Sequence, residues 1–138
     1  MPSAKALLVN STSIDLLTKG NYSHYEFLGA VENFFSKAGP AMFMGWSNLN
    51  FDRRMFHFNF FKGNRYPYLT HSSPNQEHDG LHIARAAQTL NPETLKTELT
   101  EAGNPSLALE ALARMQGFDT SQQHTAFHDA YTSLKVLR

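Results

Sequence analysis

The sequence predicts an α/β domain in which helices outnumber strands. A short apolar run, Ala41–Met44, is long enough for one buried strand and too short for a helix. The segment Lys37–Pro40 breaks the chain in front of it, and apolar residues recur at helical spacing on both sides. Asp52 follows this strand, so we expect a carboxylate at the carboxyl end of a core strand, where open α/β sheets bind ligands.

Composition narrows the class of protein. A chain of 138 residues suggests one domain, and 41% apolar with 17% charged residues excludes a disordered composition. Twelve basic and twelve acidic residues cancel, so the chain has no net positive charge that would indicate binding to nucleic acid. The absence of cysteine excludes disulfides and cysteine metal sites and fits a reducing compartment, so we expect a cytoplasmic protein. No apolar run approaches the ~18 residues of a membrane span, and Met1–Lys5 does not begin a signal peptide, so we expect no membrane partner.

Periodicity and breakers predict the elements along the chain. We expect a helix over residues 23–37 capped by Ser23, because apolar residues recur there at helical spacing after a good N-cap residue. Residues 63–78 contain two prolines and much polar material, which predicts a loop. Gly117 is predicted to end a helix in the left-handed conformation. The other predicted elements are a strand end at 6–9, a short helix at 14–19, helices at 52–61, from Pro105 and over 122–138 behind a cap at 119–121, a buried segment at 81–90, and a helical turn or two at 93–101.

The polar loop contains a first set of candidate binding residues. Arg65, Tyr66 and Tyr68 could contact a phosphate backbone or stack on bases. From the sequence alone, an exposed loop held by two tyrosines is the more frequent explanation.

The last predicted helix contains the second chemical candidate. His124 and His128 are four residues apart and would share a helical face, with Asp129 directly after. Paired histidines at this spacing can bind zinc, although Thr125 stands where a zinc protease has glutamate. Alternatively, His124 is a general base and Asp129 a metal ligand. An ordinary helix with two histidines on its polar face also fits.

Four segments in order resemble the DnaQ-like DEDDh family of 3′→5′ exonucleases, and within it the members that degrade single-stranded DNA. Asn48-Leu-Asn-Phe-Asp52 resembles the family's second motif, and His124-Thr-Ala-Phe-His-Asp129 resembles the third. The segment beginning at Asp79 resembles the strand and helix between these motifs, and the segment beginning at Pro105 resembles the helix before the third motif. The resemblance runs from about Pro2 to Arg138.

The resemblance implies a ribonuclease H-like exonuclease domain that hydrolyses single-stranded DNA with two Mg²⁺ or Mn²⁺ ions. Asp129 and Asp52 would be metal ligands, and His124 would accept the proton of the attacking water. Asn48, Arg65 and Tyr66 would bind the substrate. Hard divalent ions prefer carboxylate oxygens, and such ion pairs activate water and stabilise charge on the phosphate.

One departure from the family is large. The first motif is an Asp-x-Glu on the first strand, and no Asp-x-Glu occurs in this sequence. We therefore expect residues 1–138 to be the C-terminal part of a single catalytic domain, an α-rich fragment that lacks the first three strands and is inactive alone. The alternative is a non-catalytic nucleic-acid-binding or interaction module derived from that domain.

Two structural expectations follow. The strand at 41–46 should lie between the helix at 23–37 and the last helix, with one apolar edge unpaired, which favours self-association. Asp52 and Asp129 should face one cleft within roughly 10 Å of each other, because the two metals of such sites lie ~4 Å apart.

Overall fold

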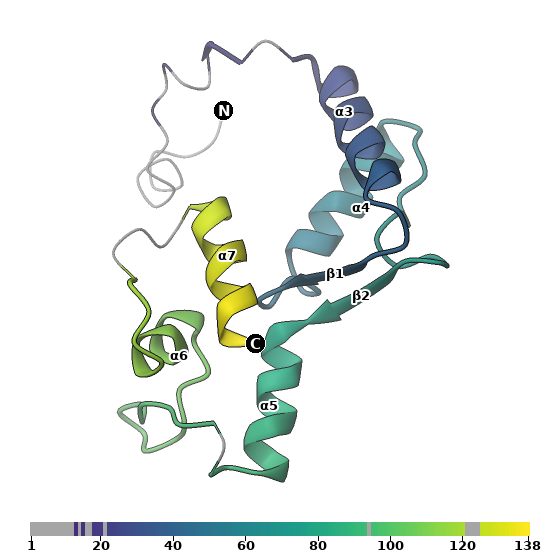
Figure 1. Ribbon diagram of the computed structural model, residues 1–138. Helices are drawn as coiled ribbons and strands as arrows, with labels where there is room; N and C mark the ends of the chain where they lie inside the picture. The colour runs from purple at the N-terminus through teal and green to yellow at the C-terminus, as the bar shows by residue number, and fades with distance from the viewer. Residues whose placement is uncertain (1–12, 14, 16–17, 21, 94, 121–124) are drawn as a thin grey trace. The chain divides into compact units, whose positions relative to one another are not determined.

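The computed structural model describes residues 13, 15, 18–20, 22–93, 95–120 and 125–138. The chain divides into two compact units, each described here by itself (Figure 1): unit 2 is Gly20–Asp79, and unit 1 is the described part of Met1–Lys19 and Gly80–Arg138. The elements in chain order are α3 (His24–Lys37), β1 (Met42–Gly45), α4 (Asp52–Lys62), β2 (Gln76–Asp79), α5 (Gly80–Leu90), α6 (Leu109–Met115) and α7 (Ala126–Val136). Every helix within the described residues is too short or too polar to span a membrane.

Unit 2 is built on a β–α–β arrangement. Strands β1 and β2 pair in parallel, with Met42 opposite Gln76 and Gly45 opposite Asp79. Parallel strands require a crossover, which α4 and the loop after it provide. The carboxyl ends of both strands therefore lie at the same end of the sheet, next to the start of α4.

Aromatic rings connect α3, β1 and α4 in the core of unit 2. The ring of Phe35 on α3 meets Phe43 on β1 at 4.8 Å and Phe56 on α4 at 5.5 Å, both edge to face. Phe56 stacks on Phe60 at 4.3 Å, and Phe60 and Leu28 are each 1% exposed. These contacts attach both helices to the Phe43 face of β1.

The start of α3 confirms the cap predicted at Ser23. The Ser23 hydroxyl accepts the amide N–H of Glu26 at 3.3 Å, and a Glu26 carboxylate oxygen accepts the Ser23 amide at 2.8 Å. This reciprocal capping box satisfies two backbone donors that a helix start leaves without partners. Hydrogen bonds from the side chain and backbone of Ser23 also hold the pKa of Glu26 below its usual value.

The prediction of a fully buried strand at 41–44 is wrong. Met42 is 58% exposed and Met44 is 41% exposed, whereas Phe43 between them points into the aromatic core. Successive side chains on a strand point to opposite faces, and within unit 2 the described helices pack on only one of them. An apolar run therefore identified the strand but not how much of it is covered.

Two assignments in polar segments are also wrong. Residues Gln76–Asp79 form β2 instead of the end of a loop, because their backbone pairs with β1 although their side chains carry no apolar alternation. In the described part of 93–101, an antiparallel bridge joins Leu99 to Pro105 instead of a helical turn. The Thr100 amide donates to the Asn104 carbonyl at 2.7 Å, so the chain reverses direction there.

The segment 81–90 is helical, as α5, but it is not buried along its length. Gly80 and Ala84 are buried, while Ile83 is 42% and Leu90 84% exposed. The buried residues of α5 are small, so the apolar residues of this segment led to a prediction of more burial than the helix has.

Both helix starts in the C-terminal part differ from the predictions. Helix α6 begins at Leu109 instead of near Pro105, after an extended residue at Ala108. Helix α7 begins at Ala126 because Thr125 is its N-cap, whose hydroxyl accepts the His128 amide at 3.3 Å. The predicted strand end at 6–9, much of the helix at 14–19 and part of the cap at 119–121 lie outside the described residues.

The predicted end of α6 is confirmed. Gly117 has φ +76°, in the left-handed region, and its amide donates to the Arg114 carbonyl at 3.0 Å. The Phe118 amide donates to the Ala113 carbonyl at 2.9 Å, which completes a Schellman motif. This turn leads toward α7, which packs against α6 around the buried residues Leu112 and Val136.

We predict that the exposed face of β1 promotes self-association. In the described residues the sheet has two strands, so each has an edge that no described strand pairs. Replacing both Met42 and Met44 by lysine should lower the associated fraction in sedimentation velocity, since charged residues disfavour strand pairing between molecules. Met115→Lys, at an exposed methionine of α6, is the control. A wild-type chain that sediments as a monomer at all concentrations would contradict the prediction.

Candidate functional site

The candidate site in unit 2 is centred on the segment between β1 and α4, residues 46–51, which we call the connecting turn. It leads from Gly45, the last residue of β1, to Asp52, the first residue of α4. Asp52 is exposed and lies at a helix N-terminus, where the helix dipole favours a negative charge. The sequence predicted Asp52 at the carboxyl end of the strand; instead the strand ends at Gly45, and Asp52 begins α4 after six intervening residues.

A buried carboxylate on β2 supports the connecting turn. Asp79 is 2% exposed, and its Oδ1 accepts the Ser47 amide at 2.8 Å. Its Oδ2 accepts the Leu49 amide at 3.3 Å. Ser47 has φ +59°, in the left-handed region that costs a non-glycine residue roughly 1–2 kcal/mol. The bond to Asp79 stabilises the turn in that conformation.

A second carboxylate of β2 holds the other side of the connecting turn. Glu77 accepts the Asn48 side-chain amide at 3.2 Å, and Arg53 on the first turn of α4 approaches it at 3.8 Å. The Glu77 side chain is only 6% exposed. The close approach of Asn48 also explains the glycine at position 45, because a Cβ on Gly45 would lie 2.8 Å from the Asn48 Cβ.

The Glu77 cluster extends into the loop before β2. The Thr70 hydroxyl donates to Glu77 at 3.2 Å, and His71 Nδ1 lies 3.5 Å from the same oxygen. The ring of His57 on α4 lies 5.0 Å from that of His71 and 5.4 Å from that of Tyr68. One buried carboxylate thus connects β2, α4, the loop and the connecting turn.

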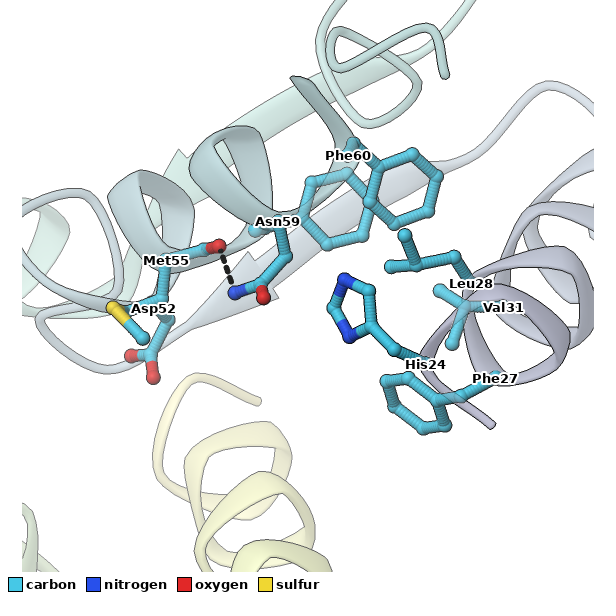
Figure 2. A pocket seen from close by; sticks show the side chains of 9 residues that line it. His24, Phe27, Leu28, Val31, Asp52, Met55, Asn59 and Phe60 are labelled. Carbon is cyan, nitrogen blue, oxygen red and sulfur yellow. Dashed lines mark hydrogen bonds between the residues drawn. The ribbon is translucent and has the colours of Figure 1, made fainter. Parts of the chain in front are cut away.

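A groove of about 300 Å³ runs between α3 and α4 and ends at Asp52 (Figure 2). Its lining is mostly apolar, with polar groups from His24, Asn59 and Asp52. The Asn59 side-chain amide donates to the Met55 carbonyl at 2.7 Å (Figure 2). The complete lining is His24, Phe27, Leu28, Val31, Asp52, Met55, Phe56, Asn59 and Phe60.

In unit 1, Asp129 lies in the first turn of α7 and is half-buried. Its amide donates to the Thr125 carbonyl at 3.0 Å, and its carbonyl accepts the Ser133 hydroxyl at 2.7 Å. His128 precedes it on the same turn and is also half-buried. His124 lies outside the described residues, so the prediction that His124 and His128 share one helical face stays a prediction.

Two of the three predicted substrate-binding residues, Asn48 and Arg65, already have partners within unit 2, and that of Asn48 is Glu77. Arg65 forms an ion pair with Glu32 on α3 and lies 4.4 Å above the Tyr25 ring, with its side chain 16% exposed. It sits at this point because Asn64, at φ +52°, ends α4 in a left-handed turn. Tyr66, in contrast, is 51% exposed. Binding of substrate by Asn48, Arg65 and Tyr66 remains a prediction.

Comparison with known proteins agrees with the resemblance seen in the sequence. No protein-family model matches the chain. Exodeoxyribonuclease I of Haemophilus influenzae (strain ATCC 51907 / DSM 11121 / KW20 / Rd) is 24% identical over 139 residues, which cover all of this chain and 29% of that protein. Exodeoxyribonuclease I of Escherichia coli (strain K12) is 26% identical over 144 residues, with the same shares.

Solved structures give the same result for the fold. E. coli exonuclease I in complex with a dT13 oligonucleotide matches with a TM-score of 0.87 and 23% identity, over 98% of this chain and 29% of that one. The complex with dA16 matches with a TM-score of 0.87 and 23% identity, over 99% and 30%. The chain has the fold of part of exonuclease I. The predicted ribonuclease H-like α/β class is thereby confirmed, and the chain spans about three tenths of the length of the relatives it matches.

The sequence analysis missed the two acidic residues that organise the site. Asp79 appeared only as part of a segment similar to exonuclease I, and Glu77 was assigned to a loop. No sequence signal separates them from solvated acids, because their burial depends on the pairing of β2 with β1. Their role becomes visible only when the strand ends are placed side by side.

We predict that His57 makes the stability of unit 2 sensitive to acid. Burial lowers its pKa below the ordinary value of 6.5, His71 and Arg53 lower it further, and Glu77 partly opposes them. As the pH falls below 6.5, the unfolded chain takes up a proton that the folded chain does not, so the free energy of unfolding should decrease until the folded pKa is passed. His57→Gln should flatten this decline in urea unfolding measured between pH 7.5 and 5.

The control for this measurement is His82→Gln, because His82 is an exposed histidine on α5. It should keep the pH dependence of the wild type. A His57→Gln chain that loses stability with falling pH as steeply as the wild type would show that another group is responsible.

Proposed function

We propose that this chain is part of a metal-dependent 3′→5′ exonuclease that hydrolyses single-stranded DNA to nucleotides in DNA repair or recombination. The observation that carries the proposal is similarity over the whole chain to exodeoxyribonuclease I of two bacteria. The matched E. coli exonuclease I structures include oligonucleotide complexes. A chain without cysteine suits a reducing compartment, and the proposal places the activity in the cytoplasm.

The proposed metal ligands fit divalent ions in kind but not in number. Asp52 and Asp129 offer the hard carboxylate oxygens that Mg²⁺ and Mn²⁺ prefer. Among the described residues, no three His, Asp or Glu side chains form a group that could hold an ion alone. Since the sequence also has no Asp-x-Glu, the proposed two-ion site needs carboxylates from another segment.

The roles of the individual residues follow from their chemistry. Divalent ions at such a site supply an activated water and stabilise charge on the phosphate. Asp52 and Asp129 would hold them, and the His124 imidazole would accept the proton of the water as a general base. Exposed Tyr66 would stack on a base, whereas the Arg65 guanidinium would have to be shared between a phosphate and the Glu32 carboxylate with which it is paired.

A non-catalytic nucleic-acid-binding or interaction module is the second candidate. Such a module would not need the Asp-x-Glu motif, which contributes two of the four acidic residues in the family that the chain resembles and does not occur in this sequence. Turnover distinguishes it from the first candidate, since such a module binds an oligonucleotide without hydrolysing it.

We predict that the chain alone shows no magnesium-stimulated exonuclease activity. A chimera, in which the segment of E. coli exodeoxyribonuclease I preceding the matched region is joined to this chain, should shorten a 5′-labelled single-stranded oligonucleotide from its 3′ end. In the chimera, Asp52→Ala and Asp129→Ala should each nearly abolish single-turnover hydrolysis because metal ligands are lost. His124→Ala should lower the rate by roughly 10²–10⁴, the range for removal of a general base, with partial recovery at higher pH.

His128→Ala is the matched control for this series, because His128 lies inside the third-motif segment but is not one of its defining positions and has no proposed role in the reaction. It should change the rate much less than His124→Ala. If the folded chimera binds the oligonucleotide but does not hydrolyse it, the binding-module candidate is correct and the proposed roles of Asp52, His124 and Asp129 fail.

We also predict that Asp52 and Asp129 lie within roughly 10 Å of each other, because ligands of a two-metal site with ions ~4 Å apart must converge. Spin labels at Arg54, near Asp52, and at Ala130, next to Asp129, would both be on exposed positions. They should give a short and narrow distance distribution in pulsed electron–electron double resonance. A distribution centred well beyond the combined reach of the two labels would contradict a shared site.

A further inference from the structure

We infer that Asp79 is a positioning residue for Asp52. The expected effect of this positioning on metal binding rests on the proposed function. The two carboxylates have different surroundings: Asp52 is exposed at the start of α4, whereas Asp79 is 2% exposed at the end of β2. Asp79 acts through the connecting turn that leads into Asp52. Both residues and the turn belong to unit 2.

The first step is the contact between Asp79 and the turn. Its two oxygens accept the amides of Ser47 at 2.8 Å and Leu49 at 3.3 Å. These donors are two residues apart, so one carboxylate fixes both the direction and the twist of the backbone there. Charge-assisted bonds of this kind are about twice as strong as neutral ones, and burial protects them from competing water.

The second step carries the constraint from the turn into α4. The Arg53 amide donates to the Asn48 carbonyl at 2.9 Å, and the Met55 amide donates to the Phe51 carbonyl at 2.9 Å. Phe51, the N-cap residue of α4, makes no side-chain capping bond. The start of the helix is therefore set by the backbone of the turn, and the turn is set by Asp79.

Glu77 restricts the same turn from its other side. It accepts the Asn48 side chain at 3.2 Å and approaches Arg53 at 3.8 Å. Because Glu77 also binds Thr70 and His71, its loss would disturb the loop as well as the turn. Asp79 is the residue to test, since its two oxygens accept the backbone amides of the connecting turn directly.

The experiment uses the isotopically labelled 138-residue chain with Asp79→Asn, which keeps the shape of the side chain. The asparagine oxygen can still accept one amide, but its NH₂ group cannot accept the second. The backbone N–H residual dipolar couplings of Asp52 and Arg53 should change, whereas that of Asn59, two turns later in α4, should stay. Thr70→Val is the control, because it removes one bond to Glu77 and none to the turn.

A second readout in the same samples reports on metal binding. Mn²⁺ should broaden the amide signals near Asp52 in the wild type and not in Asp52→Asn. Asp79→Asn should raise the Mn²⁺ concentration at half broadening by about 10–100-fold, the usual effect of losing a residue that orients a metal ligand. A purely structural contact elsewhere, such as that lost in Thr70→Val, should leave the midpoint unchanged.

The outcomes separate the two claims. Unchanged couplings at Asp52 and Arg53 in folded Asp79→Asn would overturn the positioning role, whatever the metal does. Changed couplings without Mn²⁺ broadening in the wild type would support positioning and show that Asp52 does not bind Mn²⁺ without the carboxylates of another segment. If Asp79→Asn does not fold, Asp79→Glu, which keeps both acceptor oxygens on a longer side chain, should show a smaller displacement of the same couplings, and no displacement would overturn the inference.

Discussion

The burial of one carboxylate at the end of a parallel strand pair is the constraint on which the candidate site depends. Asp79 lies beside Gly45 in the register of the sheet, and it accepts two amides from the chain leaving β1. A carboxylate this deep would be costly if its oxygens lacked donors. The turn supplies them, so strand pairing, turn conformation and the start of α4 are mutually dependent.

The aromatic core explains why this polar arrangement holds its place. Phe35, Phe43 and Phe56 attach α3 and α4 to one face of β1, while Glu77 gathers polar partners from the loop and from α4. Apolar contacts set the distance of α4 from the sheet. The buried acids Asp79 and Glu77 set the position at which α4 begins. Neither alone would fix the exposed carboxylate of Asp52, because dispersion contacts are not directional and single hydrogen bonds contribute little net stability.

Sequence reasoning worked where local chemistry decides and failed where tertiary pairing does. The Ser23 cap, the Gly117 turn and the helix from Asp52 follow from residues close together in the chain. Local patterns could not predict that β2 begins at Gln76, since its polar residues become a strand only through hydrogen bonds to β1, and only the resemblance at Asp79 pointed to a strand there. For the same reason Asp52 was found as a candidate from its neighbours, whereas the support from Asp79, 27 positions away, was not.

The connecting turn also explains how Asp52, a proposed metal ligand, can be oriented although the other ligands of the proposed site are missing from the chain. The bonds described for the turn run to β2, α4 and its own backbone, so groups of its own unit hold the turn. A ligand that is oriented by its own domain gains affinity as soon as the remaining carboxylates are supplied, because little further ordering is required. The same independence would let the turn survive in a module with no catalytic activity. Preservation of Asp52 in its turn is therefore compatible with both proposed functions, and the decision between them rests on turnover.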